Sequence, residues 1–469
     1  MTHSRMNRRH FLRLSGLIGG SAALAACAVR PVEEAPSQAG QPQPTSAPAP
    51  AGGKVQVLHR QEYFKDLENQ YKAQTEEYIR SLGYEPDVST VNPEVFGDFM
   101  AKMQAAVAAG NPPDLAYHYN SPSQMRDLDL VGDHTDIVNT LTEKYGDPVP
   151  VTVFDNVRFD GVWYSVPHSS NAGAWFIRKD WAQEAGVEIS ALNKLQDRLE
   201  AAQKMSDPAK QRFGWGMTVN KSGDGHGLIT ATFQAFGGRA VDETGTKVTF
   251  NSPETVAGIQ WLADIYTKPE YKDILPPGVE SWTDSNNNEA FLAGQIGLTV
   301  NAFSIYAKAR ADQNPILPNI GIMRFPLTND DQLELGGGGS AYYTIFKGAK
   351  QADVARQIIL HFLDPQVFTP LSILGGGLVM PAYKKAWTDD LLKADQAFPG
   401  LRDIIFNPNV YLGFGHPAKP NAAIDAAYAT GFLSQIMAEV TTGKKTAEQA
   451  VADGHKLMVQ IFEEKGLPQ

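Results

Sequence analysis

The sequence predicts an α/β fold for the part of the chain that follows residue 53. Short runs of β-branched and aromatic residues alternate with helical patterns, which is typical of this class. About 415 residues remain after that point, enough for two to four domains. Hydrophobic residues make up 42% of the chain, an ordinary share for a globular protein. The expected strands are residues 54–59, 114–119, 297–303, 319–326 and 341–346.

A helix is expected between the first two strands. Five apolar residues fall on one face of that helix: Phe96, Phe99, Met100, Met103 and Val107. We expect Asn92 to cap it, Pro93 to lie in its first turn and Gly110 to end it.

Two further units have clear helix starts. Residues 248–250 read as a short strand, and Ser252 followed by Pro253 reads as the start of the next helix. Thr446 and Gln449 have the spacing of a capping box, in which two side chains satisfy the first free amides of a helix. The last segment of the chain is therefore expected to be helical.

The first 27 residues resemble a lipoprotein export signal. Residues 7–13 form a basic segment similar to a twin-arginine signal, and the apolar stretch 14–26 is shorter than the roughly 20 residues of a membrane span. The stretch ends in Leu24-Ala25-Ala26-Cys27, which resembles a lipobox, so we expect Cys27 to carry a lipid. The alternative is an ordinary signal followed by an incidental cysteine.

The composition of the chain limits the kinds of site and partner that the protein can have. Residues 28–53, rich in alanine, proline and glutamine, are expected to form a disordered linker. Cys27 is the only cysteine, which excludes disulfides within the chain and cysteine-based metal sites. Without the signal the chain has 37 basic and 52 acidic residues, a formal charge of −15. We therefore expect no nucleic-acid partner, and modestly favour a neutral ligand.

Six segments, taken in order, resemble the bacterial extracellular solute-binding proteins of family 1, the group that includes maltose-binding protein. Gly110 to Asp114 is similar to the family's Gly-x-x-Pro-Asp turn, and Gly161 to Pro167 to its Gly-x-x-Tyr-x-x-Pro strand. The other four are residues 241–248, 289–298, 336–341 and 442–444. The resemblance runs from about Lys54 to the C-terminus.

This resemblance implies a periplasmic-binding-protein-like fold of type II, with two lobes joined by crossovers and a ligand in the cleft between them. Lobe one is expected at 54–166 with 338–376, and lobe two at 167–337 with 377–469. The crossovers are expected near Val166-Pro167, at 336–341 and at 375–380. The implied role is capture of a small carbohydrate for an ABC importer, by a monomer that contacts permease subunits and touches the membrane only through its lipid. No cofactor or metal is expected.

Two departures from the family's pattern leave the ligand open. Where the family commonly has Tyr-Asn, this chain reads Trp175-Phe176-Ile177-Arg178, and where it often has Gly-x-Trp, this chain reads Asn301-Ala302-Phe303. Alternatives to a sugar are a polyol, a glycerophosphodiester or an oligopeptide. The same fold could also serve as an envelope sensor or adhesion module.

A sugar site needs polar side chains for the hydroxyls and an aromatic plate for the apolar ring face. Such residues are expected at strand ends that face the cleft. The candidates are Gln61, Tyr63, Tyr119, Asn120, His168, Asn171, Asp224, His226, Trp282, Asn301, Phe303, Ser340, Tyr342 and Tyr411. Phe303 stands where the family has its stacking tryptophan, so it is the expected plate, with a core phenylalanine as the alternative.

Other site types have little support in the sequence. The run Gly336 to Gly339 lacks the Lys-Ser/Thr of a phosphate loop, and we interpret it as a flexible crossover. No zinc-protease or serine-hydrolase motif occurs, although the many acidic residues leave a glycosidase-like carboxylate pair possible. We therefore expect a binding protein and no catalytic residues.

Overall fold

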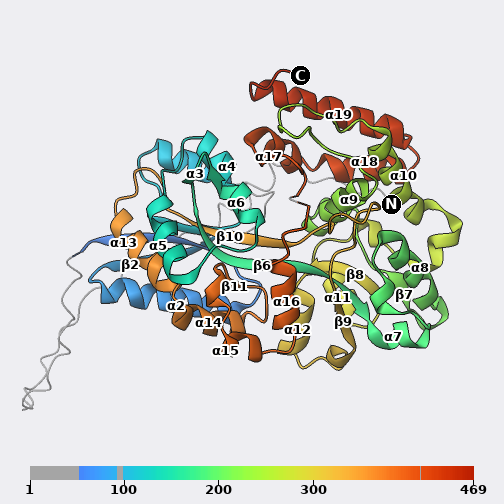
Figure 1. The fold of residues 1–469 in the computed structure, drawn as a ribbon, viewed down its shortest axis with the longest axis horizontal. Coiled ribbons are helices and arrows are strands. Elements are labelled where there is room, and N and C mark those ends of the chain that lie inside the picture. The colour runs from blue at the N-terminus through green and yellow to red at the C-terminus, as the bar shows by residue number, and fades with distance from the viewer. Residues whose placement is uncertain (1–51, 92–98, 412) are drawn as a thin grey trace, which may run out of the picture. The chain divides into compact units, whose positions relative to one another are not determined.

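One long strand, β6 (Val166–Arg178), organises the fold in this computed structural model, which describes residues 52–91, 99–411 and 413–469. The first half of β6 pairs with β10 (Gly338–Thr344), and its second half pairs with β8 (Ile296–Ala302) and β9 (Ile320–Met323), all antiparallel. β6 thus belongs to both halves of a nine-stranded sheet and carries the chain from one half to the other (Figure 1).

The first lobe, as we use the term, is the half of the sheet with β1 (Lys54–Arg60), β2 (Glu85–Val91), β3 (Leu115–His118) and β10. β1 is parallel to β2 and β3, whereas β10 is antiparallel to β3. Leu115 and Tyr117 join one core while Ala116 joins another, because successive side chains of a strand point to opposite faces. Both faces of this half are therefore covered. Its other elements are α2 (Lys65–Ser81), α3 (Phe99–Ala108), α4 (Pro122–Asp127), α5 (Thr135–Tyr145), α6 (Thr152–Val157), α13 (Ala352–Phe362), α14 (Pro365–Leu374), β11 (Met380–Pro381) and the ribbon of β4 (Arg158–Phe159) with β5 (Val162–Trp163).

The second lobe contains β7 (Phe213–Trp215), β8, β9 and the second half of β6. Trp175 and Ile177 pack in one core, and Ala174 and Phe176 pack in another on the opposite face. The helices of this lobe are α7 (Lys179–Glu184), α8 (Leu195–Met205), α9 (Gly223–Ala235), α10 (Pro253–Thr267), α11 (Asn286–Leu292), α12 (Ser304–Ala311), α15 (Asp389–Lys393), α16 (Phe398–Ile405), α17 (Ala422–Ala429), α18 (Phe432–Thr441) and α19 (Ala447–Glu464). Short 3-10 helices span Ile189–Ala191, Pro208–Lys210, Pro269–Ile274, Val279–Ser281, Leu317–Asn319 and Lys384–Ala386.

Most of the elements expected from the sequence are confirmed. All five expected strands are present with ends shifted by a few residues. Ser252 accepts the amide of Thr255 at the start of α10, and Thr446 and Gln449 form the capping box of α19. The helix expected around residue 100 is α3, but Asn92, Pro93 and Phe96 lie outside the described residues, as does the segment 1–51 with Cys27.

One expected strand is corrected. Residues 248–250 form only an isolated bridge, between Val248 and Val241. The amide of Val248 donates to the side chain of Gln469 instead of to a neighbouring strand.

Each lobe has hydrophobic core clusters of its own. The first core takes its members from residues 55–166, 341–371 and 379–383, so that its last segment lies beyond the expected 338–376. The exact lobe boundaries stay a prediction. Within the described residues, no helix is both long and apolar enough to cross a membrane.

Candidate functional site

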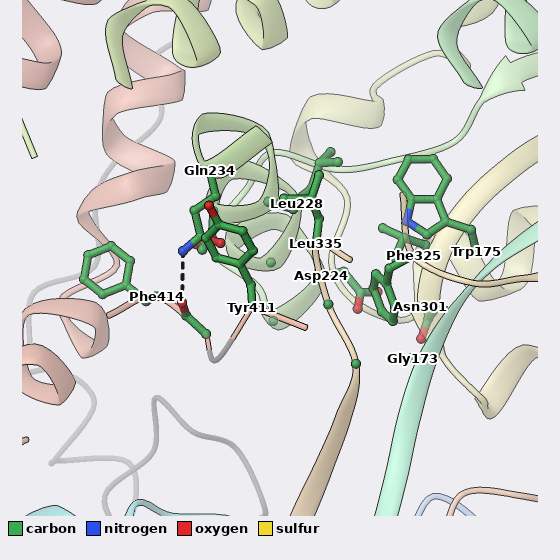
Figure 2. Close-up of a pocket in the computed structure, with 18 of the residues that line it drawn as sticks. Gly173, Trp175, Asp224, Leu228, Gln234, Asn301, Phe325, Leu335, Tyr411 and Phe414 are labelled. Atoms are coloured by element: carbon green, nitrogen blue, oxygen red, sulfur yellow. Dashed lines mark hydrogen bonds between the residues drawn. The ribbon is translucent and has the colours of Figure 1, made fainter. Parts of the chain in front are cut away.

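A cavity of about 340 Å³, which we call cavity A, opens beside β6 in the second lobe (Figure 2). Its walls come from β6, β8, one face along α9, the segments around residues 325 and 336, α17, and the residues Tyr411, Gly413 and Phe414. Figure 2 shows Trp175, Phe325 and Asp224 on one side of the cavity, and Tyr411, Gln234 and Phe414 on the other. Aromatic rings and polar groups therefore face the same space, as a site for a small amphipathic molecule requires.

Phe325 is the aromatic ring that the backbone holds most closely. A Cβ atom on Gly336 would lie 2.5 Å from Cδ1 of Phe325, and one on Gly173 would lie 3.0 Å from its Cζ. The first distance is shorter than Cβ atoms tolerate and the second is at the tight limit, so a side chain at position 336 would displace the ring and one at position 173 would crowd it. Phe325 remains partly exposed toward cavity A. It has the position and the rigidity of a stacking platform.

Asp224 is the one acidic residue among the residues that line cavity A. It lies in the first turn of α9, where Ser222 caps the helix by accepting the amide of Gly225. The Asp224 carboxylate accepts a hydrogen bond of 2.8 Å from Asn287. Burial, and to a smaller extent the neighbouring Asp284, raise the pKa of Asp224 to about 8. The side chain is therefore a neutral acid at pH 7, able to donate as well as to accept.

Asn301 uses its side chain in hydrogen bonds to neighbouring residues and has no free N–H group for a ligand. Its amide nitrogen donates to Asn287 at 2.8 Å and to Asn288 at 2.7 Å, so both of its N–H groups are used. Its oxygen accepts the hydroxyl of Ser304 at 3.1 Å. Because Asn287 in turn holds Asp224, Asn301 is a positioning residue for that carboxyl.

The opposite wall is fixed by backbone contacts. The amide of Gln234 donates to the carbonyl of Gly413 at 2.9 Å, the bond drawn in Figure 2. The ring of Tyr411 lies 4.0 Å from that of His416, and its backbone amide donates to Glu334. These contacts present the rings of Tyr411 and Phe414 as a second aromatic surface.

A second cavity of about 360 Å³, cavity B, adjoins cavity A. Gly413, Phe414 and Tyr428 line both. The remaining walls of cavity B come from both lobes: Tyr119, Ser121, Pro122, Asn156, Gly339, Ser340 and Tyr342 from the first, and Gly415, Ala418, Pro420, Ile424 and Asp425 from the second. The two cavities are therefore neighbours, and cavity B lies where the two lobes face each other.

The structure brings six of the sequence-derived candidates to these cavities. Asp224, Asn301 and Tyr411 line cavity A, and Tyr119, Ser340 and Tyr342 line cavity B. Asn171 lies beside cavity B, where its amide donates to the hydroxyl of Tyr119 at 2.9 Å. Three other candidates lie outside both cavities. Gln61 is exposed, Asn120 is buried beside His118, and Tyr63 reaches across to Asn288 in α11.

Four further candidates are corrected because their side chains face other surroundings. Phe303 has none of its surface exposed and packs against Phe176 and Tyr306. His168 stands where the register between β6 and β10 shifts, and its buried ring lies between Tyr117 and Tyr343.

The other two, His226 and Trp282, line neither cavity. His226 is buried and meets Tyr428 edge-on, so it supports that ring from behind. Trp282 packs at the edge of the core around Phe303.

The glycine run packs closely against its neighbours, and the flexibility expected of it stays a prediction. Gly336, Gly337, Gly338 and Gly339 do not adopt the left-handed conformation that favours glycine. A Cβ atom would instead collide with a neighbour at each position, for example 2.8 Å from Pro150 at Gly338 and 2.8 Å from Asn171 at Gly339. The run therefore allows close packing beside the two cavities.

The residues at the cavities that sequence reasoning missed include Gln234, Phe325, Phe414, Asp425, Tyr428 and Asn156. One signal was available for Phe325, which follows β9 in the way that Phe303 follows β8. The others come from helices and loops that only the folded chain brings together.

Comparisons with known proteins agree with this architecture. The family model of the bacterial extracellular solute-binding proteins matches residues 77–400. The putative ABC transporter periplasmic-binding protein YcjN of Escherichia coli (strain K12) is 21% identical over 318 residues, covering 64% of this chain and 68% of that protein. The maltotriose-binding protein of Pyrococcus abyssi is 22% identical over 394 residues, or 82% and 78%. Maltose-bound MalE3 of T. maritima superposes with a TM-score of 0.71 at 19% identity, over 87% of this chain and 99% of that one.

Proposed function

Since this chain belongs to the bacterial extracellular solute-binding proteins, we propose that it captures a small neutral carbohydrate and delivers it to the permease of an ABC importer. Two relatives support this role, a maltotriose-binding protein and a putative ABC transporter periplasmic-binding protein. The fold that it shares with maltose-bound MalE3 supports a sugar ligand, and we propose that closure of the two lobes brings both into contact with it.

The observation that carries the proposal is the chemistry of cavities A and B. No lysine, arginine or histidine occurs among the described residues that line them. Their two carboxyl groups, Asp224 and Asp425, both have a raised pKa because they are buried. The described walls thus offer aromatic faces, hydroxyls and amides but no cationic side chain. A sugar ring matches this combination because it has apolar C–H faces and a rim of hydroxyls.

This chemistry discriminates between the alternative ligands. A glycerophosphodiester carries a negative charge that would need an arginine, a lysine or a cluster of amides. An oligopeptide carries charged termini for which these walls offer no cation. A polyol is neutral but lacks a ring face, so it would use fewer of the aromatic surfaces. A sugar therefore fits best, and we propose no catalytic role for the chain.

The proposed location is the outer face of the cytoplasmic membrane. Membership of an extracellular family supports export. We further propose that Cys27 carries the lipid that retains the protein there, on the strength of Leu24-Ala25-Ala26-Cys27.

A thermal-shift screen followed by calorimetric titration tests the proposed function. The full mature protein is mixed with neutral mono- and disaccharides, polyols, sugar phosphates and short peptides. A bound ligand raises the melting temperature by stabilising the folded state. We expect neutral sugars to give the largest shifts, with no consumption of the sugar over hours. Stabilisation by sugar phosphates or peptides alone would contradict the proposal.

A further inference from the structure

Cavities A and B together are larger than one sugar ring needs. Each alone is near the lower end of the roughly 300–1,000 Å³ that small-molecule sites occupy, at about 340 and 360 Å³. They share three wall residues, and the rings of Phe414 and Tyr428 are two of them, so a ligand of two rings could contact both cavities. A ligand that fills only cavity A would leave cavity B to water.

The lobes already touch at the far side of cavity B. The hydroxyl of Ser121 donates to the carboxylate of Asp425 at 2.5 Å, and the hydroxyl of Ser123 donates to the same oxygen. Ser121 precedes α4 in the first lobe, and Asp425 lies in α17 of the second. Because these atoms are already in hydrogen-bond contact, the lobes cannot move closer at this point. Cavity B is therefore space that remains when the lobes meet.

The walls of cavity B suit a second sugar ring. Tyr119 and Tyr342 bring phenol groups, which are held by Asn171 and Asn156 respectively. The apolar side chains of Pro122, Pro420 and Ile424 lie among them. This mixture of hydroxyl, amide and apolar surface matches the mixed surface of a pyranose ring.

We propose that the ligand is a neutral oligosaccharide of at least two rings, with one ring in cavity A and the next in cavity B. The ring in cavity A stacks on the aromatic surfaces of Phe325 or Tyr411. The following ring lies between the lobes, against Tyr119, Asn156 and Tyr342. This inference rests on the proposed function and adds the length of the ligand to it.

Matched pairs of sugars test the inference by calorimetry on the full mature protein. The probes are glucose with maltose and laminaribiose, galactose with lactose, and the polyols mannitol and ribitol. We expect one disaccharide to bind at least roughly tenfold more tightly than its own monosaccharide, a difference of about 1.4 kcal/mol.

Asn156→Phe tests whether cavity B binds the second ring. A phenylalanine at this partly exposed position of α6 would fill cavity B and leave cavity A intact. It should remove the disaccharide's advantage and preserve the affinity for the monosaccharide. Asn156→Ala, which removes the amide without filling the space, should have a smaller effect. Asn156→Leu serves as a smaller obstruction if the phenylalanine variant folds poorly, as judged by melting.

The outcomes separate the two proposals. If a monosaccharide or a polyol is the tightest ligand and Asn156→Phe leaves its affinity unchanged, the two-ring inference is overturned and the proposed function stands. An undiminished disaccharide affinity in a folded Asn156→Phe protein also overturns it. If no neutral sugar binds, the proposed function itself fails, and the inference fails with it.

Discussion

Replacing Phe325 by alanine should lower the affinity for the sugar, whereas replacing Phe303 by alanine should lower the stability of the fold. The two residues follow β8 and β9, the strands on either side of β6 in the second lobe, but Phe325 lines cavity A and Phe303 is fully buried. Truncating an aromatic residue at the centre of a binding site costs about 2–4 kcal/mol of binding free energy. Phe325→Ala should therefore weaken sugar binding by roughly thirty- to a thousandfold.

Phe303→Ala should act on the fold instead. Removing a buried phenylalanine destabilises a protein by about 3–5 kcal/mol. For the roughly 415 residues of the folded part, the unfolding entropy is about 0.9 kcal/mol/K, so the melting temperature should fall by roughly 3–6 °C. Phe325 is partly exposed, and its replacement should lower the melting temperature by only about 1–2 °C.

Calorimetric titration with the tightest sugar of the screen and thermal melting of the unliganded protein measure both quantities. Each variant serves as the control for the other. Lost affinity in Phe303→Ala with unchanged affinity in Phe325→Ala would refute the assignment of the platform. Equal loss of stability in the two variants would refute the distinction between a cavity wall and a core residue.

Three further predictions concern the anchor, a buried histidine and the contact between the lobes. Cys27→Ala should move the protein from the detergent phase to the aqueous phase in a partition experiment, and partition like the wild type would exclude lipidation. The ring of His118, whose pKa burial lowers to about 3, accepts the amide of Asn120 while neutral. The unfolding free energy should therefore fall as the pH drops from about 6.5 toward 3, and His118→Asn should remove about 1.4 kcal/mol per pH unit of that slope; parallel profiles in denaturant titrations would contradict this. Asp425→Ala removes the hydrogen bonds that Ser121 and Ser123 donate to this carboxylate. In small-angle scattering, the unliganded variant should therefore have a larger radius of gyration than the unliganded wild type, and adding the ligand should reduce it. An unchanged radius in both states would show that this contact does not hold the lobes together.

The sequence could predict the strands and helix caps because these depend on near neighbours. The capping box of Thr446 and Gln449 needs only residues three positions apart. The family resemblance added the two lobes, which no local pattern contains. The platform could not be predicted in this way, since an aromatic residue after a strand can turn to either face of the sheet.

Phe303 and Phe325 illustrate this difference. The chain turns directly into α12 after Phe303, and that turn places the ring in a core with Phe176. Phe325 instead rests against Gly173 and Gly336, two positions that the sequence separates by more than a hundred residues. The vacant space that its ring needs is created by residues far along the chain, so only the tertiary structure identifies it.

Calorimetric titration of the full mature protein with a panel of neutral sugars tests the central claim most directly. The account predicts that at least one neutral sugar binds one to one, with an affinity that Phe325→Ala weakens by at least roughly thirtyfold. Tight binding of a sugar that is insensitive to Phe325→Ala and to Asn156→Phe would place the site elsewhere. Binding of anionic solutes or peptides in its place would contradict the assignment of a neutral carbohydrate.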